Sequence, residues 1–480
     1  MNQPEVHRYQ TVPGMWRRIL ALLMNNAIAM RAETEPESPA IVDRIRVVPS
    51  GARRHRYDID GVIAIDSAVA LPELAIFRTE NANAGEPDLI VNVGRTGGLG
   101  TRAHATILGD VDHLLYREHL GGLFANFKIE NGPPITVTAS PVLARSPHVL
   151  YTNVVEALLR FLMVKRGRVL LHAACLDLFG EGVLLSAKTD TGKTSTILRL
   201  LHHHGGSFLS DDMIIVDQHG MANRYPKPLT ISAHTLRSVP SNRLRLRQRA
   251  VLQIQSRVHS KSGRGIGQWL ARSNVPIMSI NSLVQIVIPP PKYMITDLVS
   301  CEIHQQIKMS RFFLIERGPR LISYPTHEEA LEVLLSNTED AYGFPPYAKL
   351  APKLVIGGDD YDELRRAEKA ILAKALSSVS ITRVRLDDFS WDEVIIASQN
   401  GNGAHANGNG AHANGNGAHA NGNGVHANGN GVHANGNGVH ANGNGAHANG
   451  NGAHALEGEM LDPLIDTLPV VAPETDSVTG

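Results

Sequence analysis

Residues 168–217 read RVLLHAACLDLFGEGVLLSAKTDTGKTSTILRLLHHHGGSFLSDDMIIVD, and this stretch decides the fold of the chain. Its apolar runs and turn residues predict a strand, a tight turn at Gly180–Gly182, a second strand, a loop, a helix and a further strand. Later segments continue the alternation: LVQIVIP and SRFFLIERG are typical of strands, and THEEALEVLLSN and YDELRRAEKAILAKALSS are typical of helices. We therefore expect an α/β domain over residues 151–398.

The loop after the second strand has the composition of a phosphate-binding loop. Such a loop aims backbone N–H groups at the phosphates of a nucleotide, places a helix N-terminus behind them, and adds one long cation and one hydroxyl. Lys193 is the expected cation for the β and γ phosphates, and Thr194 is the expected Mg²⁺ ligand. A loop with a purely structural role is the alternative interpretation. The residues expected to bind the nucleotide are Ala187, Lys188, Thr189, Asp190, Thr191, Gly192, Lys193, Thr194 and Ser195.

Ala187 and Asp190 stand where phosphate-binding loops usually have glycine. A methyl group at Ala187 is tolerable if the backbone keeps a negative φ. A carboxylate about 4 Å from a phosphate charge costs about 4 kcal/mol at an effective dielectric constant of about 20. That cost exceeds the roughly 1.5–3 kcal/mol of one charge-assisted hydrogen bond. We therefore expect the side chain of Asp190 to point away from the phosphates.

Two adjacent acids, Asp211 and Asp212, end the apolar approach SFLSDD shortly after the predicted helix. Neighbouring side chains on a strand point to opposite sides, so one carboxylate is expected to order Mg²⁺ while the other takes a proton from an acceptor hydroxyl. A solvated acidic turn is the alternative for such a pair. The position of the pair directly after the helix of the phosphate-binding loop favours the functional interpretation.

The stretch from Leu171 to Asp212 resembles a known family of kinases. In order and spacing it is similar to the HPr kinase/phosphorylase and ATP-dependent phosphoenolpyruvate carboxykinase group of P-loop kinases, and above all to divergent HPr-kinase-related proteins. The residues that carry this resemblance are His172, Asp177, Gly180, Gly182, Lys193, Thr194, Asp211 and Asp212.

The resemblance implies an α/β P-loop kinase domain of this type, which binds Mg-ATP. It also implies that Asp211 is the base, that Asp212 joins Thr194 in binding Mg²⁺ and that His172 lines the site, although the roles of Asp211 and Asp212 can be exchanged. The implied activity is transfer of the γ-phosphate to a hydroxyl of a protein, peptide or small-molecule acceptor. A nucleotide-binding switch without phosphoryl transfer is the alternative, and an ATP-dependent carboxykinase has less support.

The segment from Arg237 to Arg272 contains basic residues and no acid. Arg264, in the glycine-flanked sequence SGRGIG, is the candidate to stabilise transition-state charge. Docking of an anionic partner and a solvated loop are the alternatives. Nucleic acid is not an expected partner, because no aromatic residues are interleaved with the arginines.

The region before the α/β domain has a different pattern. Residues 1–39 are expected to form an N-terminal helical segment, and residues 40–150 a mostly β domain of short strands separated by turns. Asn131-Gly132, between two alternating runs, predicts a hairpin. The following NVVEALLRFLMVKRG predicts a connecting helix, with Asn153 and Glu156 as a capping box and Gly167 at its end.

Overall composition limits the possible partners. Lys plus Arg equals Asp plus Glu at 46 each, so no global field draws the 480-residue chain toward nucleic acid or an anionic membrane. Cys175 and Cys301 are too few for a disulfide framework, which favours a reducing cytoplasm. The apolar run from Ile19 is shorter than the roughly 20 residues of a membrane span and lacks a cleavage site. We expect no membrane segment and no export signal, and leave a homo-oligomer open.

The C-terminal part of the chain is repetitive. Residues 399–455 contain eight copies of NGNGAHA or NGNGVHA, whose composition offers no apolar stripe that could offset backbone entropy. We therefore expect a disordered linker, followed by an acidic tail over residues 456–480 that is either unstructured or a short docking motif.

Overall fold

The chain divides into two compact units, residues 1–392 and residues 393–480. The expected N-terminal helical segment, Thr189, Asp190, Arg264 and the acidic tail after Leu456 lie outside the residues that the structure describes. The computed structural model describes residues 54–80, 85–94, 96, 106–109, 112–118, 125–188, 191–231, 235, 276–290, 292–342, 346–399 and short strands between residues 405 and 456.

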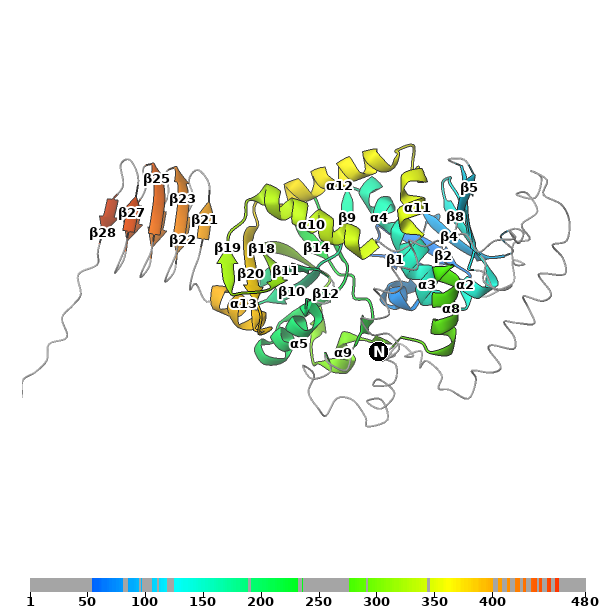
Figure 1. Cartoon of the computed structure of the whole chain (residues 1–480), viewed down its shortest axis with the longest axis horizontal. Coiled ribbons are helices and arrows are strands. Elements are labelled where there is room, and N and C mark those ends of the chain that lie inside the picture. Colours follow the sequence, from blue (N-terminus) through cyan, green and yellow to red (C-terminus); the bar gives the residue numbers. More distant parts are fainter. Residues whose placement is uncertain are drawn as a thin grey trace, which may run out of the picture. The chain divides into compact units, whose positions relative to one another are not determined.

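The first unit begins with an eight-stranded mixed sheet, in the order β3-β1-β2-β4-β8-β7-β6-β5 (Figure 1). β2, β4 and β8 run parallel to one another, and the other neighbours are antiparallel. Asn131 and Gly132 lie in the connection between β7 and β8, as the hairpin signal predicted. The strands are β1 (His55–Ile59), β2 (Ile63–Ser67), β3 (Arg78–Thr79), β4 (Leu89–Val93), β5 (Thr106–Gly109), β6 (His113–Arg117), β7 (Phe127–Glu130) and β8 (Ile135–Ala139).

The helix that follows this sheet belongs to the core. α4 (Glu156–Lys165) is buried at every position except Lys165, which is typical of a helix with apolar neighbours all round. One hydrophobic cluster joins Ile65 of the first sheet with Leu158 of α4 and Leu364 of α12 (Tyr361–Leu376). The segments on either side of residue 150 therefore share one core.

The helical run around Asn153 begins earlier than the sequence pattern predicted. α2 (Pro141–Ala144), α3 (Pro147–Leu150) and the π-helix η4 (Tyr151–Val155) come directly before α4. Asn153 thus lies inside a helical run, where its side-chain amide donates to the carbonyl oxygen of Val149. The expected capping box between Asn153 and Glu156 is therefore wrong, because Asn153 bonds to Val149 and the carboxylate of Glu156 accepts from Lys227. Gly167, with a φ of +70°, follows the helix as expected.

The second sheet of this unit is mixed and has ten strands. Eight of them follow the order β17-β12-β10-β11-β18-β14-β13-β9, while β20 pairs with β18 and β19 pairs with β20. α10 (His327–Tyr342) and α12 pack on one face, and Figure 1 shows α5 (Lys193–His204) on the other. The expected mixed α/β architecture is present. The strands are β9 (Arg168–Leu171), β10 (Ala174–Leu178), β11 (Glu181–Ala187), β12 (Ser207–Ser210), β13 (Ile214–Asp217), β14 (Met221–Asn223), β17 (Glu302–Ile303), β18 (Gln306–Arg317), β19 (Leu321–Ser323) and β20 (Ser380–Leu386).

The order of the strands brings distant segments to one edge of this sheet. β10 lies between β11 and β12 and is antiparallel to both, so β11 and β12 run in the same direction. Their C-terminal ends therefore lie at the same edge as the N-terminal end of β10. The loop after Ala187, the acidic pair after Ser210 and the residue His172 before β10 meet at this edge.

One expected strand is helical. The run LVQIVIP lies largely in α8 (Ile277–Val287), where Met278, Ser282 and Ile286 are buried at a spacing of four residues. A short continuous apolar run cannot be assigned to a strand or a helix by periodicity alone. Here the segment is helical and buries one face of the helix. The remaining elements are η3 (Pro72–Phe77), β15 (Leu229–Thr230), β16 (Lys292–Tyr293), α9 (Ile295–Leu298), α11 (Tyr347–Leu350), η6 (Ala351–Lys353) and α13 (Trp391–Gln399). None of the helices in the described part of the chain has the length and apolar character that a membrane span requires.

The second unit differs from the expectation of a disordered linker, which is not confirmed. Each repeat contributes one short strand, and each strand pairs in parallel with the strand two repeats further on, as in His405 with His419. The repeats thus form two four-stranded sheets that alternate along the chain, and paired residues lie 14 positions apart in the sequence. Figure 1 shows these short strands in a row. Backbone pairing between identical neighbours replaces the apolar stripe that the repeats lack. The strands are β21 (His405–Asn407), β22 (His412–Asn414), β23 (His419–Asn423), β24 (His426–Asn428), β25 (His433–Asn437), β26 (His440–Asn442), β27 (His447–Asn449) and β28 (His454–Leu456).

Candidate functional site

The loop between β11 and α5 holds the predicted phosphate-binding residues. Ala187 is the buried last residue of β11, and Lys188 is exposed. Thr189 and Asp190 lie outside the described residues, so the predicted outward direction of Asp190 stays a prediction. Thr191 closes the loop, because its N–H and its hydroxyl donate to the carbonyl oxygen of Lys188 at 3.2 and 2.7 Å.

Gly192 fixes the point at which α5 begins. It is the residue before the helix and has a φ of +123°, a conformation that L side chains rarely adopt. A Cβ atom at this position would lie 3.0 Å from the ring of Phe389 and 3.1 Å from that of Trp391. Only glycine therefore fits this position without displacing two aromatic side chains. Ser195, in the first turn of α5, is buried.

Lys193 is the first residue of α5, where helical N–H groups lack intrahelical partners and the helix dipole is positive. Its side chain is 10% exposed, and its Nζ lies 4.0 Å from Oδ1 of Asp212. Among the residues that the structure describes, this Nζ has no hydrogen-bond partner. Leaving a buried ammonium group without a hydrogen bond is costly, so the position is suited to a group that accepts from it. An anion would satisfy both Lys193 and the helix N-terminus.

Thr194 and Asp211 form a second contact at the same sheet edge. The hydroxyl of Thr194 donates a 2.7 Å hydrogen bond to Oδ2 of Asp211. The other carboxylate oxygen of Asp211 is buried, with no hydrogen-bond partner in the described part of the chain. Burial raises the pKa of Asp211, although Lys193 and Thr194 oppose the effect. The pair therefore offers one hydroxyl and one unused carboxylate oxygen to a ligand.

Asp212 faces a different set of groups. Its side chain is half exposed, and its carboxylate lies 3.1 Å from Nζ of Lys227 and 3.4 Å from Nδ1 of His172. Burial alone would raise the pKa of Asp212, but the charges of Lys227 and Lys193 hold it well below its usual range. Asp212 is therefore an ionised carboxylate that solvent can reach.

His172 lines the site as a neutral ring. It is 7% exposed, because it precedes β10 at the crowded sheet edge. Burial, reinforced by the charge of Lys193, lowers the pKa of His172 to about 3. At physiological pH the imidazole can accept or donate a hydrogen bond but adds no charge.

Two residues of the site were missed by the sequence analysis. Lys227, in the segment RYPKPLTIS, binds Asp212 and also lies 2.7 Å from Oε2 of Glu156. Burial alone would lower the pKa of Lys227, but Glu156 and Asp212 raise it, so the ammonium group stays charged. Glu156 was assigned to a capping box, and the only sequence signal for Lys227 was its place shortly after the acidic pair, between two prolines.

Other residues of the family resemblance have structural surroundings. Oδ1 of Asp177 accepts from the N–H of Gly180, and Oδ2 lies 2.9 Å from His304. Asp177 thus stabilises the turn between β10 and β11. At Gly182, β11 approaches the main chain of β18 so closely that a Cβ atom would lie 2.3 Å from the carbonyl oxygen of Lys308. Arg264 lies outside the described residues, and its predicted role stays a prediction.

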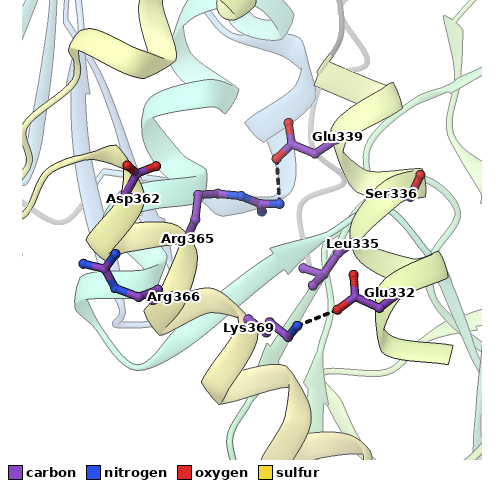
Figure 2. A pocket seen from close by; sticks show the side chains of 8 residues that line it. All are labelled: Glu332, Leu335, Ser336, Glu339, Asp362, Arg365, Arg366 and Lys369. Atoms are coloured by element: carbon purple, nitrogen blue, oxygen red, sulfur yellow. Dashed lines mark hydrogen bonds and ion pairs between the residues drawn. The ribbon is translucent and has the colours of Figure 1, made fainter. Parts of the chain in front are cut away.

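A separate pocket of about 500 Å³ lies between α10 and α12 (Figure 2). Its charged groups are largely paired with each other, with 2.5 Å between Lys369 and Glu332 and 2.9 Å between Arg365 and Glu339. These pairs connect the two helices and leave few charged groups of the pocket free to bind a ligand. The pocket is lined by Glu332, Leu335, Ser336, Glu339, Asp362, Arg365, Arg366 and Lys369.

The acidic groups of the site fit Mg²⁺ only in combination with a ligand. Within the described ranges, no three His, Cys, Asp or Glu side chains are grouped so that they could hold a metal ion by themselves. Mg²⁺ is commonly bound by one or two protein oxygens together with substrate phosphates and water. The Thr194 hydroxyl and the unused oxygen of Asp211 suit that mode of binding.

Comparison with known proteins gives no further assignment. No protein-family model matches this chain, and no curated protein matches it in sequence. The functional argument therefore depends on the residues of the site.

Proposed function

We propose that this chain is an ATP-dependent phosphotransferase of the HPr-kinase-like type, which transfers the γ-phosphate to a hydroxyl of a protein, peptide or small molecule. The observation that carries the proposal is the buried Nζ of Lys193, which lacks a hydrogen-bond partner in the described part of the chain and stands at the start of α5. A triphosphate would satisfy this ammonium group and the helix N-terminus together.

Thr194 and Asp211 are the proposed Mg²⁺ ligands. This is the exchanged form of the assignment from the sequence, and the 2.7 Å bond between the two side chains favours it. Mg²⁺, when bound, would neutralise charge on the β and γ phosphate oxygens. Asp211 is more deeply buried than Asp212, which suits a residue that touches a metal rather than an incoming acceptor.

Asp212 is the proposed partner of the acceptor hydroxyl. During transfer the bond between the γ-phosphorus and its bridging oxygen breaks, a bond from the acceptor oxygen to phosphorus forms, and the hydroxyl proton passes to the Asp212 carboxylate. Since phosphoryl transfer depends mainly on positioning and charge, a carboxylate with a low pKa can serve by orienting the hydroxyl. His172, whose neutral ring has its Nδ1 3.4 Å from this carboxylate, lines the same side of the site.

The experiment follows radioactive phosphate from [γ-³²P]ATP into pools of proteins, peptides and metabolites. We expect the wild-type chain to label an acceptor and Asp212→Asn to lower the labelling by about 10²–10⁴-fold while ATP still binds. Asp362→Asn, the same change at an exposed position of α12, is the matched control and should label normally.

The outcome also separates the two function classes. Saturable binding of Mg-ATP without loss of γ-phosphate in any pool would contradict the transferase and leave a nucleotide-binding switch. Labelling that is unchanged in Asp212→Asn would contradict the role given to this carboxylate.

A further inference from the structure

Lys227 occupies a fixed position beside Asp212. It follows β14 and precedes β15, and its backbone N–H donates to the carbonyl oxygen of Tyr225. Its side chain is 7% exposed, and its Nζ also lies 5.7 Å from the centre of the Tyr151 ring. The ammonium group is therefore held by neighbours on several sides and cannot swing freely into solvent.

Two ammonium groups converge on one carboxylate. Oδ2 of Asp212 lies 3.1 Å from Nζ of Lys227, and Oδ1 lies 4.0 Å from Nζ of Lys193. The carboxylate of Asp212 thus shows that the two lysines can hold an anionic group between them. A phosphoryl group next to Asp212 would meet the same two cations.

Glu156 gives Lys227 its orientation. The carboxylate of Glu156 lies 2.7 Å from Nζ on the side of the protein core. Glu156 is the first residue of α4, directly after the π-helix η4, and π-helical turns often occur at functional sites. Tyr151 is the first residue of this turn, and its hydroxyl lies 2.6 Å from that of Tyr225, which connects the turn to the segment that carries Lys227.

We propose that Lys227 is a second phosphate-binding cation of this site, selective for the γ-phosphate, and that Glu156 is its positioning residue. The inference rests on the proposed function, because it requires a triphosphate in the loop. Lys227 contacts Asp212, on the acceptor side, while Lys193 stands at the start of α5 on the loop side. In this arrangement Lys227 would bind the terminal phosphate, and Lys193 would bind the phosphates nearer the loop. Lys227 would also stabilise transition-state charge, the role for which Arg264 was the candidate from the sequence.

The test compares dissociation constants for ATP and ADP, both with Mg²⁺, by isothermal titration calorimetry on the full chain. Because ADP lacks the γ-phosphate, Lys227→Met should weaken ATP binding by about ten- to a hundredfold and change ADP binding by less than about threefold. Lys227→Arg, which keeps the charge, should recover most of the affinity for ATP. A purely structural role of Lys227 would lower both affinities together.

A second variant guards against misfolding. Lys227→Met leaves the Glu156 carboxylate buried without its cation, so the double variant Lys227→Met/Glu156→Gln removes both charges. It should show the same selective loss of ATP affinity. An unchanged ratio of ATP to ADP affinity in the double variant would overturn the inference.

Failure of the inference can be distinguished from failure of the proposed function. If the wild-type chain binds ATP, Lys193→Ala does not, and the Lys227 variants keep the wild-type ratio, only the role of Lys227 is wrong. If the wild-type chain takes up neither nucleotide, the proposed function and the inference are both overturned.

Discussion

The hydroxyl of Thr194 donates a 2.7 Å hydrogen bond to the carboxylate of Asp211, across 17 residues of sequence. Thr194 belongs to the first turn of α5, and Asp211 follows β12, so the bond joins the loop of β11 to a strand that is not its neighbour. β10 lies between the two strands. The contact therefore brings the loop and the acidic pair together at one edge of the sheet.

Gly182 should not tolerate a side chain. A Cβ atom there would lie 2.3 Å from the main-chain carbonyl oxygen of Lys308, so β11 and β18 would have to separate. We expect Gly182→Ala to lower the free energy of unfolding by about 1–3 kcal/mol in urea titrations. Gly132→Ala is the control, because its Cβ would meet only the carbonyl oxygen of Pro134, at 3.6 Å. Equal unfolding midpoints for the two variants would contradict the close approach.

Arg160 should be essential for stability. Its guanidinium is fully buried, donates to both carboxylate oxygens of Glu368 at 2.8 and 2.9 Å, and lies 4.7 Å from the centre of the Tyr342 ring. We expect Arg160→Met to cost about 3–5 kcal/mol, because it leaves a buried carboxylate without its main cation. The double variant Arg160→Met/Glu368→Gln should recover part of that loss in thermal unfolding.

A surface pair provides the comparison for Arg160. Lys369 and Glu332 form an ion pair whose side chains are 50% and 58% exposed, so water competes for both charges. Lys369→Met should therefore unfold at nearly the wild-type temperature. A loss as large as that of Arg160→Met would show that burial does not decide the energetics here.

The stability of the first unit should depend on the titration of His172. Burial and Lys193 lower the pKa of this ring from 6.5 to about 3. Below pH 6.5 the unfolded chain binds a proton that the folded chain takes up only near pH 3, so this ring makes the free energy of unfolding fall as the pH falls through that window. The slope from one such ring is about 1.4 kcal/mol per pH unit.

Urea unfolding of the wild-type chain and of His172→Asn between about pH 7.5 and about pH 5 measures this slope. We expect the free energy of unfolding of the variant to depend less steeply on pH than that of the wild-type chain, by the contribution of about one proton. Parallel curves for the two chains would mean that His172 is protonated in the folded state, against the neutral ring inferred from its burial.

The repeat strands should be protected from hydrogen exchange. In β21 to β28 each backbone ladder pairs equivalent positions two repeats apart, with identical residues in every pair except Asn442 and Leu456, so strand N–H groups are shielded by their neighbours. We expect amide exchange at least about tenfold slower than in an unstructured peptide of the same sequence, slowest in the central repeats. Uniform exchange at the rate of the peptide would contradict the paired strands and support the disordered linker that the repeat composition predicts.

The local features of the site could be predicted from the sequence, since they depend on short spacings. The strand, loop and helix around Lys193 and the acidic pair after β12 lie within about one supersecondary unit, and their order along the chain specifies them. The sheet order that brings His172 to the same edge depends on β10 pairing with two strands at once, which no local pattern records.

The features that the sequence did not predict are set by distant or repeated contacts. Glu156 binds Lys227 across 71 residues, so its spacing from Asn153 suggested a cap that tertiary contacts overrode. The run LVQIVIP, which lies largely in α8, was expected as a strand, because a short apolar run fits both structures until its neighbours are known. The repeats lack an apolar stripe, yet in-register pairing between copies supplies the backbone bonds that a single copy cannot make.

The most direct test of the account is a calorimetric titration of the full chain with ATP and Mg²⁺, in the wild type and in Lys193→Ala, with Lys369→Ala as the exposed control. The account predicts saturable binding of one nucleotide per chain in the wild type and the control, and at least about a hundredfold weaker binding in Lys193→Ala. Absence of saturable binding in the wild type, or equal affinity in Lys193→Ala, would contradict the claim that this loop binds a triphosphate.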